Sequence, residues 1–210
     1  MELDDLTPGT LEYLGRAAYL QLVLFENLAR VVTAAPTPTA KESLGWVASA
    51  ALAQHHGLVA LIEREGGEPG AAMEASVAGI DEFQRRTAGE DWPQNLMTCY
   101  LSAGFLDEFL VKLAAGLPRD LPERVREVMA ADSELERLAL LLEAQIADHP
   151  RQASRLAMWG RRLVGDIMLV ARGSLVSSID RGRDEEKIEP VFTELIAAHT
   201  RRMDRLGLTA

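Results

Sequence analysis

The chain has 210 residues, a length that fits one domain, and 48% of them are hydrophobic while only 5% are aromatic. Its formal net charge of −10 disfavours a generic nucleic-acid binder that works by neutralising phosphates, and its single cysteine, Cys99, excludes an intrachain disulfide and a thiolate metal cluster. The first residues lack the pattern of a signal peptide, and no apolar run is long enough to span a membrane, so we expect a cytoplasmic protein.

Proline and glycine signals divide the chain into helical segments. Thr7 and Pro8 are typical of an N-cap and a first helical turn, which predicts a helix over about 8–34. Further helices are expected, in chain order, at about 43–66, 72–86, 92–116, 121–148, 150–178 and 189–206. Because no strand pattern interrupts them, the predicted fold class is all-α.

Long helices in a chain of this size must lie side by side. A four-helix bundle with additional C-terminal helices is the economical arrangement. We expect a single domain over 1–210, with a core bundle at about 7–148 and appended helices at about 150–208.

Each of the four long bundle segments carries an acid or a histidine on its apolar face. Glu26, His55 and Asp132 each share a line of three- and four-residue steps with aliphatic residues. Asp107 and Glu108 lie on adjacent apolar lines, and their spacing leaves open which of them faces the core. An unpaired carboxylate there costs several kcal/mol, so each acid needs a partner or a cation.

A dinuclear carboxylate site in a bundle takes one Glu from each of two helices and a Glu-x-x-His pair from each of the other two. The chain departs from this template twice, since Leu52 stands three residues before His55 and Leu135 three residues after Asp132. His56 is the alternative inward-facing histidine. About four ligands are left, enough for one metal ion but too few for the usual di-iron centre.

Each candidate ligand also has an ordinary structural interpretation. Glu26 could turn toward solvent, and His55 could be a hydrogen-bonded core residue. Glu108 has a natural ion-pair partner in Lys112, four residues further along the helix. Cys99 lies in a helical interior, where we expect an inert thiol.

The run at 156–166, Leu-Ala-Met-Trp-Gly-Arg-Arg-Leu-Val-Gly-Asp, and the run at 199–208 resemble actinobacterial ferritin-like proteins that are related to the tRNA 2-methylthio-N6-isopentenyladenosine hydroxylase. The resemblance extends over nearly the whole chain and includes the candidate ligands. It implies a ferritin-like bundle. In members that keep the metal site, it also implies a non-haem di-iron centre that activates oxygen for hydroxylation.

By position, the resemblance assigns one metal ligand to each of four helices: Glu26, His55, Glu108 and Asp132. Leu52 and Leu135 stand where the family has an acid and an imidazole, and leucine at these places dries the site and fills its volume. The leading prediction is a ferritin-like protein with a degenerate di-iron site. Such a protein binds no cofactor, or only weakly binds iron or manganese, and it acts by binding a protein or a ligand.

Two other functions stay open: an iron- or manganese-dependent oxygenase with an altered ligand set, and an RNA-associated factor. The RNA hypothesis, with tRNA as the partner, arises because Arg151, Arg155 and Arg162 share one helical face. Pairing with acidic helices is the competing role for these arginines, and we expect Asp166 to pair with Arg162. A homodimer or another protein partner is also expected, because the Ala-rich second helix permits close helix packing.

Overall fold

The computed structural model describes residues 3–130, 132–176 and 181–209, except for the side chains at 4, 132, 133 and 181–183. The α-helices of these ranges are α1 (Thr10–Ala34), α2 (Pro38–Arg64), α3 (Pro69–Arg86), α4 (Trp92–Leu113), α5 (Leu121–Val128), α6 (Asp132–Asp148), α7 (Ala153–Arg172) and α8 (Arg181–Arg205). Since no strand occurs among the described residues, the all-α prediction is confirmed.

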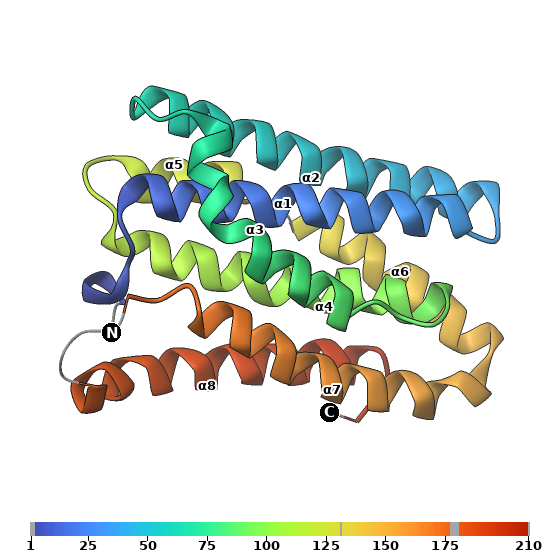
Figure 1. The fold of residues 1–210 in the computed structure, drawn as a ribbon. Helices are drawn as coiled ribbons and strands as arrows, with labels where there is room; N and C mark the ends of the chain where they lie inside the picture. Colours follow the sequence, from blue (N-terminus) through green and yellow to red (C-terminus); the bar gives the residue numbers. More distant parts are fainter. Residues whose placement is uncertain (1–2, 131, 177–180, 210) are drawn as a thin grey trace.

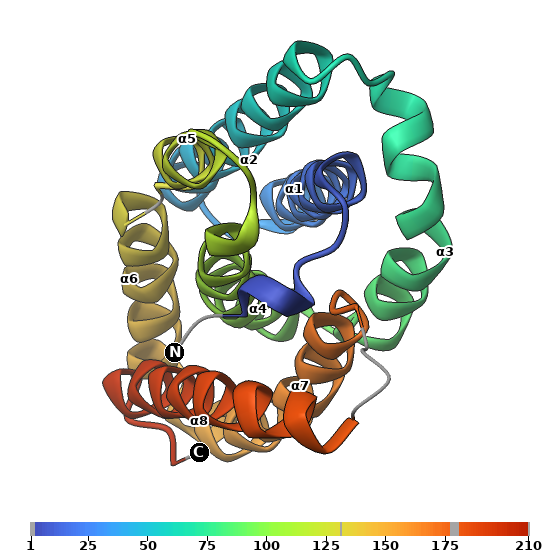
Figure 2. The ribbon, with the colours of Figure 1, turned by 90° about the vertical axis from the view of Figure 1, so that its left-hand side faces the viewer.

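The helices α1 and α4 form the middle of the bundle. Figure 1 shows α1, α2, α4, α7 and α8 running side by side along the long axis of the molecule. In the view along that axis, the other helices surround α1 and α4 (Figure 2). The C-terminal helices share the same apolar core, since Phe192 of α8 packs edge-on against Phe105 of α4. None of the described helices combines the length and apolar character needed to cross a bilayer.

Local capping explains where several helices begin and end. The Thr37 hydroxyl and the Glu68 and Asp91 carboxylates each accept a hydrogen bond from a backbone N–H in the first turn of the helix that follows. Gly66 and Gly207 follow α2 and α8 with φ of 79° and 68°, a conformation that glycine adopts without steric penalty.

The first two helices begin at other residues than predicted. Thr7 does not cap α1, because its hydroxyl donates to the carbonyl of Leu113 at 2.8 Å, and Gly9 is the residue before the helix. The second helix begins at Pro38 instead of near Ser43, because Thr37 and Pro38 together supply the cap and the first turn.

The predicted helix at 121–148 is two helices. α5 ends at Val128, and α6 begins at Asp132. The apolar periodicity continues through the break, so the sequence pattern alone hides it. Asp132 is therefore the first residue of a helix, where aspartate is favoured, and it does not interrupt the middle of an apolar stripe. Its side chain lies outside the described part of the structure.

The two C-terminal helices also have different bounds from those predicted. α7 ends at Arg172, before Gly173 and a turn in which the Ser174 N–H donates to the carbonyl of Ala171; residues 177–180 of the predicted helix lie outside the description. α8 begins well before 189 and carries Pro190 in its interior. The sequence pattern indicates a start near this proline because proline is common in a first helical turn.

Candidate functional site

The centre of the bundle is the place where a dinuclear site would lie, and it contains two small cavities. One, of about 20 Å³, is lined from α1, α2, α4 and α6. The other, of about 30 Å³, lies between α1 and α4 and is also lined by Phe83 of α3. Leu24, Ala103 and Asp107 line both cavities, so Asp107 lies between them.

Asp107 is a buried acid that is bound by an amide. The Gln21 Nε2 group of α1 donates to its Oδ1 at 2.6 Å, while Gln21 Oε1 has no hydrogen-bond partner among the described residues. Burial raises the pKa of Asp107 to about 7, against the opposing effects of the Gln21 hydrogen bond and the positive charge of Arg202. The protonated, uncharged carboxyl is therefore well populated near neutral pH.

Glu26 does not face the core, and this predicted placement is wrong. Its side chain is 48% exposed, and its Oε2 lies 3.5 Å from the guanidinium of Arg30 in the next helical turn. The buried polar side chain of α1 that contacts Asp107 at the centre is Gln21. Glu26 therefore faces solvent, which is the alternative placement considered for it in the sequence.

His55 is the buried histidine of the pair, and His56 is exposed. The His55 Nδ1 lies 2.9 Å from the carbonyl oxygen of Ala18, so Nδ1 carries the proton and donates to α1. Neither cavity at the centre is lined by His55; its neighbour Gln54 lines the smaller one. The second helix thus presents an amide to the centre.

Glu108 is directed away from the centre, toward α8. Its Oε2 accepts a hydrogen bond from Arg202 at 3.0 Å, and Lys112, its predicted partner, pairs with Glu194 at 2.9 Å. Arg202 lies directly against Gly104 of α4, where an added Cβ would come within 2.5 Å of the arginine Nε. Of the two adjacent acids in α4, Asp107 is therefore the one that lines the central cavities.

The two positions predicted to have lost ligands differ in placement. Leu135 of α6 lines the central cavity, whereas Leu52 of α2 does not. The cavity-facing pairs at the Glu-x-x-His spacing are Ala51 with Gln54 in α2 and Leu135 with Leu138 in α6. Among the described residues, no three His, Cys, Asp or Glu side chains gather closely enough to hold a metal ion.

The ferritin-like domain family of actinomycetes matches residues 6–180 of the chain. The chain belongs to this family. The match confirms the predicted ferritin-like fold, and it extends over α1 to α7. A search of curated proteins finds no match.

The single cysteine of this family member lies in the core. Cys99 is buried in α4 beside the larger central cavity. Burial raises the pKa of its thiol to about 12, so the nucleophilic thiolate is scarce at neutral pH.

The three arginines of the predicted anion-binding surface, on and before α7, differ in their contacts. Arg151 and Arg162 are exposed, and the Arg162 guanidinium lies over the ring of Trp159, 5.2 Å from its centroid. Arg155 pairs with Asp91 at the start of α4. Arg155 is therefore occupied within the chain, and only the other two of the three predicted contacts are open to an anionic partner.

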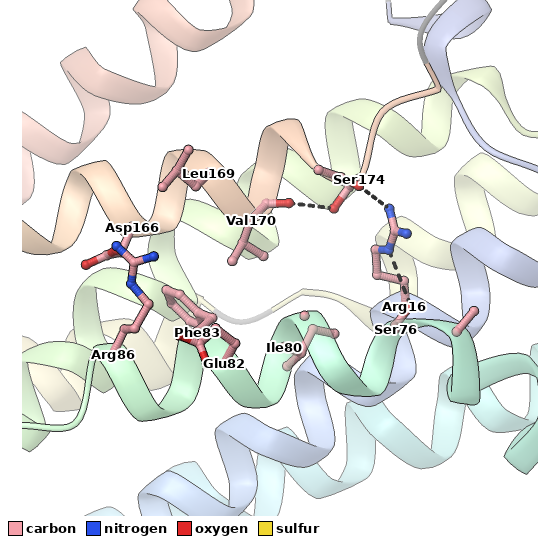
Figure 3. A pocket seen from close by; sticks show the side chains of 13 residues that line it. Arg16, Ser76, Ile80, Glu82, Phe83, Arg86, Asp166, Leu169, Val170 and Ser174 are labelled. Atoms are coloured by element: carbon pink, nitrogen blue, oxygen red, sulfur yellow. Dashed lines mark hydrogen bonds and ion pairs between the residues drawn. The ribbon is translucent and has the colours of Figure 1, made fainter.

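A much larger cavity, of about 380 Å³, lies between α3 and α7 (Figure 3). Sequence reasoning missed it, because it depends on how two distant helices are placed. Asp166 lines it and pairs at 2.8 Å with Arg86 of α3, so the predicted Asp166–Arg162 pair is wrong. Arg16 of α1 lies at the other end of the cavity.

Proposed function

We propose that this protein is a ferritin-like binding protein without a functional di-metal centre. The observation that carries the proposal is the set of possible metal-binding groups around the smaller central cavity. Among the described residues, only Gln54, Asp107 and Glu134 line it with polar side chains, and its other lining residues are Ala, Val and Leu.

This donor set does not fit a dinuclear iron or manganese site. Such a site takes four carboxylates and two imidazoles from its four helices. Here the pairs at the required spacing are Ala51 with Gln54 and Leu135 with Leu138. Gln54 supplies one amide, and the other three side chains are apolar. Asp107 is already bound by Gln21, and its protonated form competes with metal binding.

The small volume of the central cavities also indicates that an organic ligand would bind elsewhere on the protein. Cavities of about 20 and 30 Å³ hold a water molecule each, whereas pockets for organic ligands measure roughly 300 Å³ or more. An organic substrate has no room beside Asp107. Ligand binding is therefore assigned to the surface of the bundle.

We also propose that the chain shares its scaffold, without the metal chemistry, with the tRNA hydroxylases that its sequence resembles. The run at 156–166 supports this, since it packs α7 against its neighbours. Trp159 Nε1 donates to Thr98 Oγ1 of α4 at 3.0 Å. Gly160 lets Met203 of α8 approach, because an added Cβ would come within 2.6 Å of that methionine.

Metal analysis tests the proposal. The purified protein is incubated anaerobically with excess Fe(II) or Mn(II), passed over a desalting column and analysed for bound metal. We expect far less than one ion per chain. Two matched variants, Asp107→Asn at the centre and Glu26→Gln on the exposed face, should give the same low value.

The opposite result would be clear. One or two ions per chain, lost in Asp107→Asn and kept in Glu26→Gln, would show that the centre binds metal after all. That outcome would favour the oxygenase with an altered ligand set. A metal content that neither variant changes, at well below one ion per chain, supports the binding protein.

A further inference from the structure

A cavity of about 420 Å³ lies between the C-terminal part of α1 and the loop that joins α3 to α4, and we call it the Trp92 cavity. The end of α3 and the start of α4 complete its lining. None of its described lining residues also lines the cavity between α3 and α7. Pockets for organic ligands measure roughly 300–1,000 Å³, so the Trp92 cavity has the volume that the bundle centre lacks.

The loop that forms one wall of the Trp92 cavity is held by two amide side chains of α4. Asn95 Oδ1 accepts a hydrogen bond from the Gly89 N–H at 2.9 Å, and Asn95 Nδ2 donates to the Asp91 carbonyl at 2.8 Å. Gln94 Oε1 accepts a hydrogen bond from the Glu90 N–H at 2.8 Å. Because these contacts fix the loop backbone, the wall is already formed before a ligand binds.

A second part of the lining is an amide pair that joins Asn27 of α1 to Gln84 of α3. Asn27 Oδ1 accepts hydrogen bonds from Arg30 Nη1 at 2.9 Å and from Gln84 Nε2 at 3.0 Å. A guanidinium has only donors, so the contact with Arg30 fixes which atom of the Asn27 amide is the oxygen. Gln84 therefore presents its nitrogen to that oxygen.

This pairing leaves one donor and one acceptor for a ligand. Asn27 Nδ2 and Gln84 Oε1 have no hydrogen-bond partner among the described residues. Both side chains are half-buried and line the Trp92 cavity. The amide pair thus offers an N–H group and a carbonyl oxygen that belong to neighbouring, hydrogen-bonded side chains.

The charged side chains that line the Trp92 cavity do not favour a charged ligand. Arg30 lies 3.5 Å from the carboxylate of Glu26, and Asp91 pairs with Arg155. Glu90 has no ion-pair partner among the described residues, but it is exposed, so solvent screens its charge. The polar groups left to select a ligand are therefore the uncharged amides.

Trp92 supplies an aromatic surface to the same cavity. Its Nε1 donates to the Val31 carbonyl at 2.9 Å, so the indole is held in place and its N–H is already used. The side chain is half-buried and lines the cavity. An aromatic ring that is held in this way favours a flat ring in the ligand, which can stack against it with an offset.

We infer that the Trp92 cavity binds a flat, uncharged ring with a lactam edge, which contacts Trp92 with its ring and the Asn27–Gln84 pair with its lactam. The lactam N–H donates to Gln84 Oε1, and the lactam carbonyl accepts from Asn27 Nδ2. A lactam carries both groups on one edge, so it satisfies both amides at once. At about 30 Å³ per molecule of liquid water, the cavity has room for roughly 14 non-hydrogen atoms. The inference rests on the proposed binding role and gives it a ligand class.

Titration of the isotope-labelled full chain with 2-quinolinone, followed by NMR, tests the inference. Coumarin is the matched probe, because a ring oxygen replaces the lactam N–H in a molecule of the same shape. We expect 2-quinolinone to bind about tenfold more tightly than coumarin, since coumarin leaves Gln84 Oε1 without a donor. The indole N–H signal of Trp92 should shift with both probes.

Two variants divide the amide pair into its parts. Gln84→Met removes the acceptor and should remove the difference between the probes. Asn27→Asp keeps the oxygen that Arg30 and Gln84 contact but replaces the Nδ2 donor. It should weaken both probes by about tenfold, because both carry the carbonyl that Nδ2 binds.

The matched control is Gln145→Met, since Gln145 is a half-buried residue of α6 that donates to Gln152 at 3.5 Å and does not line the cavity. It should leave binding unchanged, and so should Glu90→Gln. Equal binding of the two probes, a difference kept in Gln84→Met, or a tenfold loss in Glu90→Gln would overturn the inference. Metal analysis of the same samples separates this failure from failure of the metal-free proposal.

Discussion

The bundle centre and the α3–α7 pocket both lie where three or more elements meet, and both place an acid among apolar side chains. They neutralise that acid differently. At the centre, Asp107 accepts a hydrogen bond from the Gln21 amide, and its raised pKa favours the uncharged carboxyl. The two cavities beside it measure about 20 and 30 Å³. In the pocket, Asp166 is paired with an arginine beside about 380 Å³ of open volume. The first site is closed core, and the second is an open pocket.

Under the proposed binding role, the bundle keeps the ferritin-like fold while its centre is packed with apolar side chains. Leu135 and Leu138 fill the place where a metal pair would need ligands, so the centre contributes stability. α3 lies between α2 and α4 in the chain and packs over α1, which leaves a groove beside α7.

The largest expected effect comes from placing a charge at the centre. Leu138→Glu puts a carboxylate beside Asp107 in a cavity whose described lining includes no Lys or Arg, and we expect a loss of about 3–5 kcal/mol in unfolding free energy at pH 8. The control on the same helix is Leu140→Glu, at an exposed position, which should change stability by less than about 0.5 kcal/mol. Urea unfolding measures both. If Leu138→Glu were tolerated, the centre would be a hydrated polar site.

A smaller effect follows from the pKa of Asp107, which burial raises from 3.8 to about 7. The folded state binds a proton more tightly than the unfolded state, so this group lowers stability as pH rises from about 4 to 7. Asp107→Asn keeps an acceptor for Gln21 and removes the charge. We expect it to be more stable than the natural protein by a few kcal/mol at pH 8 and about equally stable at pH 4.

Urea unfolding across this pH range measures the difference between the two proteins. The gain in Asp107→Asn should grow with pH and level off above about 7. A constant difference from pH 4 to 8 would mean that Asp107 is ionised throughout. It would then need a cation at the centre.

The smallest expected effect concerns the Arg86 bridge at the pocket. Arg86→Gln leaves the nearly buried Asp166 without its partner, and we expect a loss of about 1 kcal/mol, because Arg86 itself is half exposed and solvent screens the pair. The neighbouring Arg85→Gln breaks only an exposed pair with Glu82 and should cost close to nothing. Equal losses in the two variants would show that the bridge does not define that end of the pocket.

Local signals in the sequence predict most of this fold. Asp91 and Pro93 mark the start of α4 where the sequence predicts it, and the apolar periodicity indicates helices throughout. Thr37 and Glu68 cap helices that begin a few residues before the predicted starts. The break before Asp132 is invisible to that pattern, because the apolar line runs through it. Pro190 misleads for the opposite reason: it resembles a helix start, but α8 already begins at Arg181.

The candidate site is harder to predict, because adjacent helical residues differ by only about 100° in direction. Asp107 and Glu108 both have apolar helical neighbours, and the choice between them depends on Gln21 and Arg202 in distant helices. Glu26 shows the same difficulty at the edge of an apolar face. The α3–α7 pocket has no local signal, since it arises only when Arg16 and Arg86 join helices far apart in the chain.

Anomalous diffraction tests the central claim most directly. Crystals grown with excess Mn(II) or Fe(II) are measured at the absorption edge of the metal, and an anomalous difference map is calculated around Asp107. We expect no peak there and a direct Gln21–Asp107 contact. A peak within coordination distance of Asp107 and Gln54 would contradict it and identify the bundle centre as a metal site.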